Sequence, residues 1–143
     1  MKEYLYGQKG IFQCEISDLI GRTMMAIEVS AERDEIKMTC ADGVFCFFHE
    51  QNCCENVLIE DITGDIQDLI GYPILMAEES TSELTPEGYQ HRYCEPESQT
   101  WTFYKLATIK GYVDIRWFGK SNGYYSEKVS LEFTPSQPKE KNT

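Results

Sequence analysis

The chain has 143 residues and carries a formal net charge of -11 at pH 7. This length suits one domain with a single core, and the acidity argues against direct binding to DNA or RNA, because neutralising phosphates requires a basic surface. The first residues hold no apolar segment like that of a signal peptide, and no run approaches the ~18 apolar residues of a membrane helix. We therefore expect a cytoplasmic protein with no membrane partner and with its six cysteines reduced.

A short motif occurs twice, at an offset of fifty residues. The segments 16–21 and 66–71 both consist of isoleucine, a polar residue, aspartate, leucine, isoleucine and glycine. Each copy is typical of a short helix that ends at a glycine cap and leads into a strand. The spacing predicts an internal repeat of 15–64 and 65–134, with a chance similarity of two amphipathic turns as the alternative.

Alternating apolar residues predict strands at 25–30 and 35–40. The sequence Ala-Asp-Gly at 41–43 is a good hairpin connection, because glycine tolerates the positive φ that such turns need. It leads into the apolar run 44–48, which predicts a strand covered on both faces. We expect these three strands to form an antiparallel meander. After the second motif, the apolar run 73–77 predicts a further strand.

Residues 78–100 break all periodicity and contain two prolines, a glycine and six glutamates. A stretch of this length inside a compact domain is typical of a flexible loop or of a flap over a site. We expect a flexible loop. A flap is the alternative, because potentially functional side chains fall within the stretch, namely His91, Arg92, Tyr93 and Cys94.

The last third of the chain carries the strongest hairpin signal, Asn122-Gly123 between two alternating runs. Aromatic and basic residues on one face of such a hairpin are typical of a binding surface. The expected ligand- or partner-binding residues are Tyr112, Arg116, Phe118, Tyr124, Tyr125 and Lys128. The alternative is that a second layer covers this face and makes it ordinary core.

Taken together, these elements predict an α+β fold, in which a mostly antiparallel β-sheet is accompanied by two short helices. We expect a single domain over residues 1–134, with two repeated halves if the motif reflects a duplication. The polar segment 135–143 is expected to be a disordered tail.

The densest group of reactive side chains lies within residues 46–55. The potential zinc ligands there are Cys46, His49, Cys53 and Cys54. The same group offers a cysteine nucleophile with His49 as its base. Neither pattern matches a family signature, and buried reduced cysteines often serve only as small apolar groups. We therefore expect no cofactor and no enzymatic activity, with a zinc protein or a small hydrolase as the alternative.

Four segments resemble a family of small uncharacterised proteins of bacteriophages and prophages. They are His49-Glu50-Gln51-x-Cys53-Cys54-Glu55, the turn Asp68 to Gly71, the run Trp101 to Gly111, and Arg116-Trp117-x-Gly119-x-Ser121-Asn122-Gly123-Tyr124-Tyr125-Ser126. The resemblance spans roughly Leu19 to Phe133. It implies a phage setting, the host cytoplasm and an accessory role, and it assigns no catalytic residue.

The acidity, the aromatic hairpin and this resemblance predict a non-catalytic accessory binding protein. We expect an inhibitor or sponge that acts on a host component, such as part of an antiviral system. Its target would be a host protein or a nucleotide-like small molecule. A phage structural or assembly protein, which would form homo-oligomers, stays open as an alternative.

Overall fold

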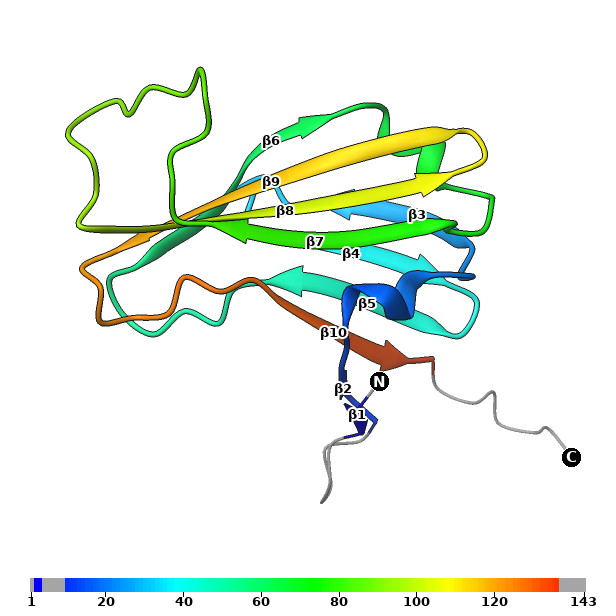
Figure 1. Cartoon of the computed structure of the whole chain (residues 1–143). Helices are drawn as coiled ribbons and strands as arrows, with labels where there is room; N and C mark the ends of the chain where they lie inside the picture. The colour runs from blue at the N-terminus through cyan, green and yellow to red at the C-terminus, as the bar shows by residue number, and fades with distance from the viewer. Residues whose placement is uncertain (1, 4–9, 137–143) are drawn as a thin grey trace, which may run out of the picture.

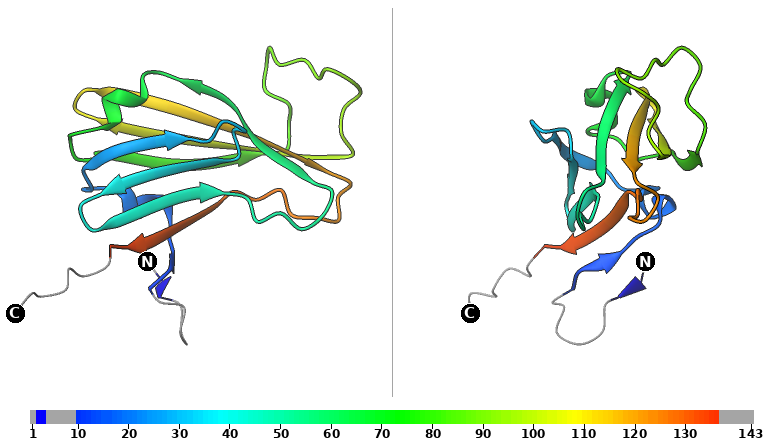
Figure 2. Two further views of the ribbon diagram at one scale, coloured as in Figure 1. Left: turned by 180° about the vertical axis from the view of Figure 1, so that it is seen from behind. Right: turned by 90° about the vertical axis from the view of Figure 1, so that its left-hand side faces the viewer.

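The computed structural model describes residues 2–3 and 10–136. In it, two antiparallel sheets pack face to face (Figure 1; Figure 2, right). The strand orders are β1-β2-β10-β5-β4-β3 in the six-stranded sheet and β6-β9-β8-β7 in the four-stranded sheet. The six-stranded sheet contains β1 (Lys2–Glu3), β2 (Phe12–Gln13), β3 (Met24–Val29), β4 (Glu35–Cys40), β5 (Gly43–Phe48) and β10 (Ser130–Pro135). The four-stranded sheet contains β6 (Asn56–Thr63), β7 (Met76–Ser82), β8 (Ser98–Thr108) and β9 (Gly111–Ser121).

One hydrophobic core fills the space between the sheets. Period-2 alternation sends every second side chain of each strand inward, and the rings of Phe47 from β5 and Tyr104 from β8 meet there edge to face, with centroids 4.9 Å apart. Trp117 from β9 is also fully buried in this core. The outer face of the four-stranded sheet is therefore formed by the other set of side chains, and the candidate site lies on that face.

The predicted α+β class is wrong, because the described residues form strands and two single turns of 3-10 helix. These turns are η1 (Ile16–Leu19) and η2 (Ile66–Leu69). Each has only four residues before the chain turns at a glycine, which is too short to offset the cost of nucleating an α-helix. Each nevertheless buries its leucine completely. The protein is an all-β sandwich in its described part.

The meander predicted in the first half is confirmed as β3, β4 and β5. The loop predicted at 78–100 is shorter, because β7 continues to Ser82 and β8 begins at Ser98. Of the predicted tail, residues 137–143 lie outside the described residues. Pro135 ends β10, and the Ser136 N–H donates to the Asp42 carbonyl at 2.9 Å.

The predicted hairpin at Asn122-Gly123 is also wrong. β9 pairs with β8 and β6, whereas β10 pairs with β5 and β2 in the other sheet. The turn preference is satisfied locally, since the Asn122 side chain accepts the Tyr124 N–H at 2.9 Å. Burial of Val129, Leu131 and Phe133 then decides the pairing of the following strand, because these side chains enter the core from the six-stranded sheet.

The last strand of each half crosses to the opposite sheet. Segment 49–55 leads from β5 to β6, and segment 122–129 leads from β9 to β10. The strands of the two halves can be matched in order, β3 with β7, β4 with β8, β5 with β9 and β6 with β10. The strand order β10-β5-β4-β3 in one sheet then corresponds to β6-β9-β8-β7 in the other. This is the arrangement that a duplication with exchanged last strands would produce.

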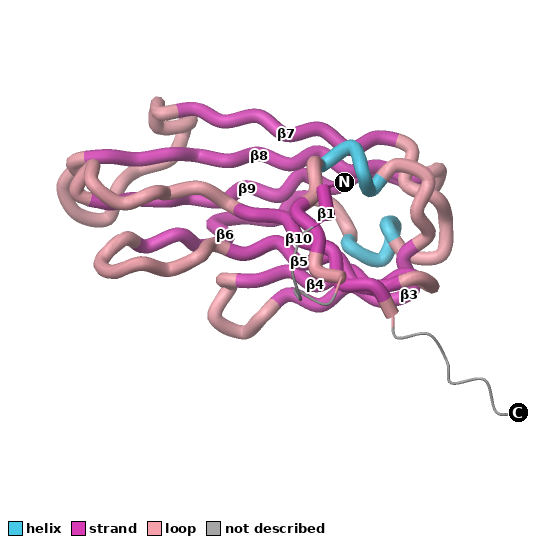
Figure 3. The backbone as a smooth tube through the Cα atoms, turned by 90° about the horizontal axis from the view of Figure 1, so that it is seen from below, coloured by secondary structure: helices cyan, strands magenta, loops and turns pink. Residues whose placement is uncertain are grey.

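The two 3-10 turns lie side by side at one end of the sandwich (Figure 3). The Gly21 N–H donates to the Ile74 carbonyl at 2.8 Å, and the Gly71 N–H donates to the Met24 carbonyl at 2.8 Å. The two bonds are equivalent, because the donors Gly21 and Gly71 are fifty residues apart and so are the acceptors Met24 and Ile74. These bonds join the start of β3 to the segment that leads into β7.

Alanine at either glycine should destabilise the protein by about 1–2 kcal/mol, because Gly21 and Gly71 have φ values of 87° and 89°. No atom lies within 4 Å of a Cβ built at either position, so the cost comes from the backbone alone. Urea unfolding of Gly21→Ala and Gly71→Ala measures it, with the exposed Gln67→Ala as the control. Equal stability of Gly71→Ala and Gln67→Ala would contradict this explanation.

Candidate functional site

Three connecting segments gather at the end of the sandwich opposite the 3-10 turns (Figure 1). They are the two crossovers, 49–55 and 122–129, and the loop 83–97 between β7 and β8. We call this the crossover end. It holds the group of reactive side chains noted in the sequence and a concave surface lined by residues of β6, β9 and the loop.

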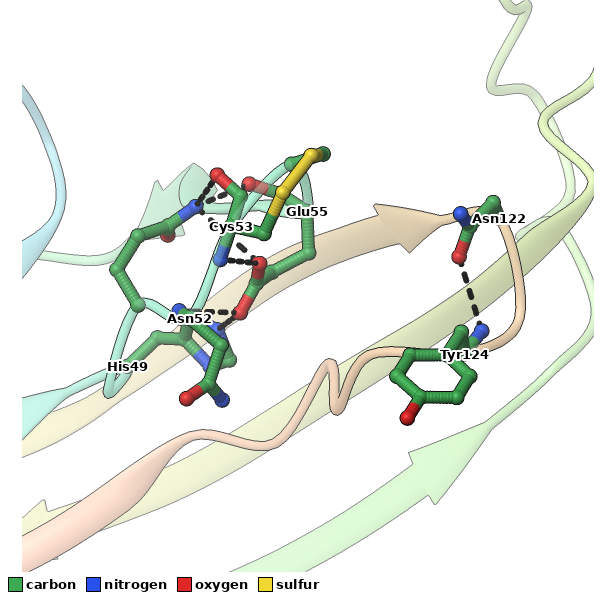
Figure 4. The surroundings of a disulfide bond; sticks show 8 residues. His49, Asn52, Cys53, Glu55, Asn122 and Tyr124 are labelled. Atoms are coloured by element: carbon green, nitrogen blue, oxygen red, sulfur yellow. Dashed lines mark hydrogen bonds and ion pairs between the residues drawn. A yellow bond between two sulfur atoms is a disulfide. The ribbon is translucent and has the colours of Figure 1, made fainter.

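A buried histidine–glutamate pair organises the first crossover (Figure 4). The Nε2 atom of His49 lies 2.8 Å from a carboxylate oxygen of Glu55, and its Nδ1 atom lies 2.6 Å from the Lys128 carbonyl in the second crossover. A carbonyl oxygen can only accept, so Nδ1 donates to Lys128, and Nε2 faces the Glu55 carboxylate. His49 therefore links the two crossovers directly.

The carboxylate of Glu55 also accepts backbone hydrogen bonds from Asn52 and Cys53, each at 2.9 Å. Burial alone would raise its pKa, but the hydrogen bonds from His49, Cys53 and Asn52 outweigh burial and lower the pKa of Glu55 to about 2. The side chain is fully buried and stays ionised at neutral pH. Its role in this arrangement is to hold a tight turn.

The structure does not bring the predicted zinc ligands together. Cys46 lies on β5, and both ring nitrogens of His49 are already hydrogen-bonded. Cys53 and Cys54 are joined to each other as a disulfide between neighbouring residues, which differs from the expectation that all cysteines are reduced. No group of three or more potential ligands arranged for a metal ion occurs among residues 2–3 and 10–136. In this arrangement neither sulfur of the pair is free to act as a nucleophile.

A second carboxylate is buried in the other crossover. Glu127 accepts a hydrogen bond from Thr100 on β8 at 2.7 Å and another from Ser121 at the end of β9 at 2.5 Å. It packs against β9 at Gly119, where an added Cβ would lie 2.9 Å from the Glu127 Cβ atom. Each crossover is thus held by one buried glutamate.

The loop 83–97 folds back over the outer face of the four-stranded sheet and is held there by a chain of hydrogen bonds. Trp101 on β8 donates through Nε1 to Gln99 at 3.0 Å, and Gln99 donates to the Thr85 hydroxyl at 3.0 Å. The hydroxyl of Thr85 in turn lies 2.9 Å from Nε2 of His91. The loop is therefore connected to β8 through Thr85 near its start and His91 in its middle.

Aromatic rings complete this attachment. Tyr89 meets Trp101 edge to face with centroids 4.8 Å apart, and it also contacts the rings of His91 and Phe118. Phe118 stacks on Trp101 with centroids 4.2 Å apart and planes 14° from parallel. The guanidinium of Arg116 lies over the Trp101 ring and forms an ion pair with Glu60. Trp101 is consequently fully buried although it belongs to the outer face.

A pocket of about 670 Å³ lies between this loop and the edge of the sheet formed by β6 and β9. Its sheet side is apolar at Leu58 and Phe118, with Asn56, Glu60 and Lys120 around them. Its loop side runs from His91 to Glu97 and includes Tyr89. The volume and the mixture of aromatic and polar lining fall within the range of sites for small molecules.

The predicted binding residues do not form one surface. Tyr112 shares the outer face of β9 with Arg116 and Phe118, but it lies six residues from Phe118, roughly 20 Å along the strand. Tyr124 and Tyr125 contact each other within the second crossover, and Tyr124 is 83% exposed. Of the six predicted residues, only Phe118 lines the pocket, while Arg116 lies over the Trp101 ring and pairs with Glu60, which also lines it. Lys128 contributes its backbone carbonyl to His49 instead.

Sequence reasoning missed the residues that build the pocket from β6 and from the loop. Leu58, Asn56 and Glu60 read as ordinary members of a strand, and Gln99 and Thr85 have no motif. One signal could have found them. Trp101 and Phe103 lie on the face of β8 opposite the core residue Tyr104, and large aromatic side chains on an outer face indicate that another segment covers them.

The fold and the site define an acidic, two-sheet β-sandwich with a preformed pocket beneath a long loop. The chain belongs to the family described as a domain of unknown function, DUF7448, whose sequence profile matches residues 17–131. No curated protein and no solved structure gave a significant match. Across the described residues, no helix has the length and apolar character needed to pass through a membrane.

The low pKa of Glu55 predicts a specific loss of stability in acid. Its pKa is about 2 in the folded protein against an ordinary value of 4.5, so its stabilising contribution is complete above pH 4.5 and disappears as the pH falls toward 2. Unfolding of wild type and Glu55→Gln, measured between pH 7 and pH 2, should show a stability difference that shrinks over this interval. The exposed Glu50→Gln is the control, and a wild-type advantage over Glu55→Gln that persists unchanged at pH 2 would contradict the assignment.

The hydrogen-bond chain through Thr85 predicts the behaviour of the loop. Thr85→Val removes the central hydroxyl, so trypsin cleavage after Arg92 should become about 2- to 10-fold faster, as expected from losing a net 0.5–1.5 kcal/mol. The global unfolding midpoint should change little, because the loop lies outside the core. Thr81→Val on the exposed part of β7 is the matched control. Equal cleavage rates in the two variants would show that the chain of bonds does not hold the loop.

Proposed function

We propose that this protein is a non-catalytic binding protein and that the pocket beneath loop 83–97 is its binding site. The observation that carries this proposal is the attachment of the loop to Trp101 by hydrogen bonds and by the ring of Tyr89. A loop that is already packed loses little further freedom when a ligand enters, which favours affinity.

The imidazole and the adjacent cysteines that a hydrolase centred on residues 46–55 would use are engaged in structural bonds. His91, the imidazole that lines the pocket, contacts the Thr85 hydroxyl through Nε2, and His49 uses both ring nitrogens. Cys53 and Cys54 are bonded to each other. These engagements support binding without catalysis rather than a hydrolase centred on residues 46–55.

The shape of the site favours a small molecule over a protein as the target. A concave pocket of about 670 Å³ suits a compact ligand, whereas protein partners typically bury about 800 Å² on each side. The resemblance to phage proteins supports a target within a bacterial host. We accordingly prefer a sponge that sequesters a host small molecule, such as a nucleotide-like signal, over an inhibitor of a host protein.

Native mass spectrometry after incubation with a bacterial small-molecule extract tests this proposal. The wild type should gain a ligand mass of several hundred daltons. Phe118→Ala should reduce occupancy about 5- to 100-fold, since one stacked ring contributes roughly 1–3 kcal/mol. Tyr112→Ala, on the same strand and face but at the far end, should retain the ligand. Equal occupancy in Phe118→Ala and wild type, or no bound mass in either, would contradict the pocket as the binding site.

A further inference from the structure

We propose that the pocket accepts a heteroaromatic ring that carries a single anionic group, of the kind found in a nucleoside monophosphate. The ring would stack on Phe118 and the anion would face Lys120. This inference rests on the proposed function, because it names the ligand class for the same pocket.

The register of three neighbouring strands creates a place for a flat ring. Trp101 on β8 lies directly opposite Phe118 on β9, and Phe118 lies directly opposite Leu58 on β6. The centroids of Trp101 and Phe118 are 4.2 Å apart and their planes are nearly parallel. This separation is close to the ~4.7–4.9 Å spacing between strands, so the two rings stack along the direction that runs from strand to strand.

The stack stops at Phe118 because the next residue in register, Leu58, is aliphatic. Trp101 stacks on Phe118, and the rings of Tyr89 and His91 lie at a tilt to Phe118 with centroids 5.8 and 5.7 Å away. Phe118 and its partner in register, Leu58, both line the pocket. A planar ring lying above Leu58 would occupy the third position of the stack. Stacking on an aromatic side chain strengthens the binding of a base and needs no particular base, because every base has a flat π face.

Polar groups flank this position on both sides along the strands. Two residue pairs further along, on the same face of the sheet, are Asn56 and Lys120, which are partners in register. On the other side lies Glu60, held by its ion pair with Arg116. An amide and a carboxylate offer both donors and acceptors to the edge of a ring. A heteroaromatic ring can use these groups, whereas a plain hydrocarbon ring cannot.

The charges around the pocket limit the ligand to one anionic group. Lys120 is exposed and forms no ion pair within the described part of the chain, so its ammonium is available to an anion at the pocket mouth. On the loop side Arg92 also lines the pocket, beside the carboxylates of Glu95 and Glu97, and the whole chain carries a net charge of -11. A triphosphate would meet repulsion from these carboxylates that a monophosphate largely avoids.

Fluorescence of Trp101 reports on the stack and tests the inference. The chain has only two tryptophans, so Trp117→Phe leaves Trp101 as the sole reporter. Its emission should change on titration with the four common nucleoside monophosphates, with at least one binding more tightly than its nucleoside and its triphosphate. Calorimetric titration of the wild type gives the same comparison if loss of the buried Trp117 impairs folding.

Two variants assign the contacts. Lys120→Gln should weaken monophosphate binding about 3- to 5-fold, to the level of the nucleoside, as expected for an exposed ion pair, and Lys110→Gln at the opposite end is the matched control. Leu58→Trp should fill the third stacking position and abolish binding while leaving the Phe118–Trp101 contact in place.

Three outcomes would overturn the ligand class: no binding of any nucleoside monophosphate, tighter binding of an aromatic carboxylate such as benzoate, or full binding by Leu58→Trp. In each of these cases, a Phe118-dependent mass captured from the extract would still support the proposed function. The failure of the inference is thereby distinguishable from the failure of the site.

Discussion

The architecture depends on how the chain satisfies its polar groups where it leaves one sheet for the other. Because β6 and β10 each pair in the sheet opposite to the strand that precedes them, segments 49–55 and 122–129 leave the regular ladder of backbone hydrogen bonds. Glu55 accepts the backbone N–H groups of the first segment, and Glu127 accepts two hydroxyls beside the second. His49 joins the two segments. A buried ion pair adds little net stability compared with apolar residues, so we interpret it as a device that fixes the geometry of the crossing.

That geometry determines the candidate site. The first crossover delivers the start of β6 beside the end of β9, and this pair forms the sheet side of the pocket. The loop 83–97 forms the other side and is attached through Trp101 on the next strand. The pocket is therefore built from segments that the crossovers and the sheet register hold in place. The same register aligns Trp101, Phe118 and Leu58, on which the proposed ligand class rests.

Many of the strands could be predicted from the sequence, but the fold class and the way the strands are connected between the two sheets could not. Period-2 alternation located β3, β4 and β9, because inward and outward side chains differ strongly in polarity there. β5 was located by its unbroken apolar run, 44–48. The motif around Leu19 and Leu69 has a helical pattern and was misassigned, since four residues cannot show whether a turn propagates into an α-helix. The Asn122-Gly123 signal is local, whereas the pairing of β10 is decided by burial of its apolar face against strands distant in sequence. Phe118 could be chosen from its face of β9, but Gln99 and Thr85 acquire a role only once the loop packs on the sheet.

The central claim is that loop 83–97 is packed on the sheet before any ligand binds. Nuclear Overhauser effects between the aromatic protons of Tyr89 and Trp101 in the free protein test it most directly, because the two ring centroids are 4.8 Å apart. The account predicts strong cross-peaks between these rings and ring-current shifts on Phe118, all present without ligand. Random-coil shifts for Tyr89 and no contact with Trp101 would contradict a preformed pocket and the functions proposed from it.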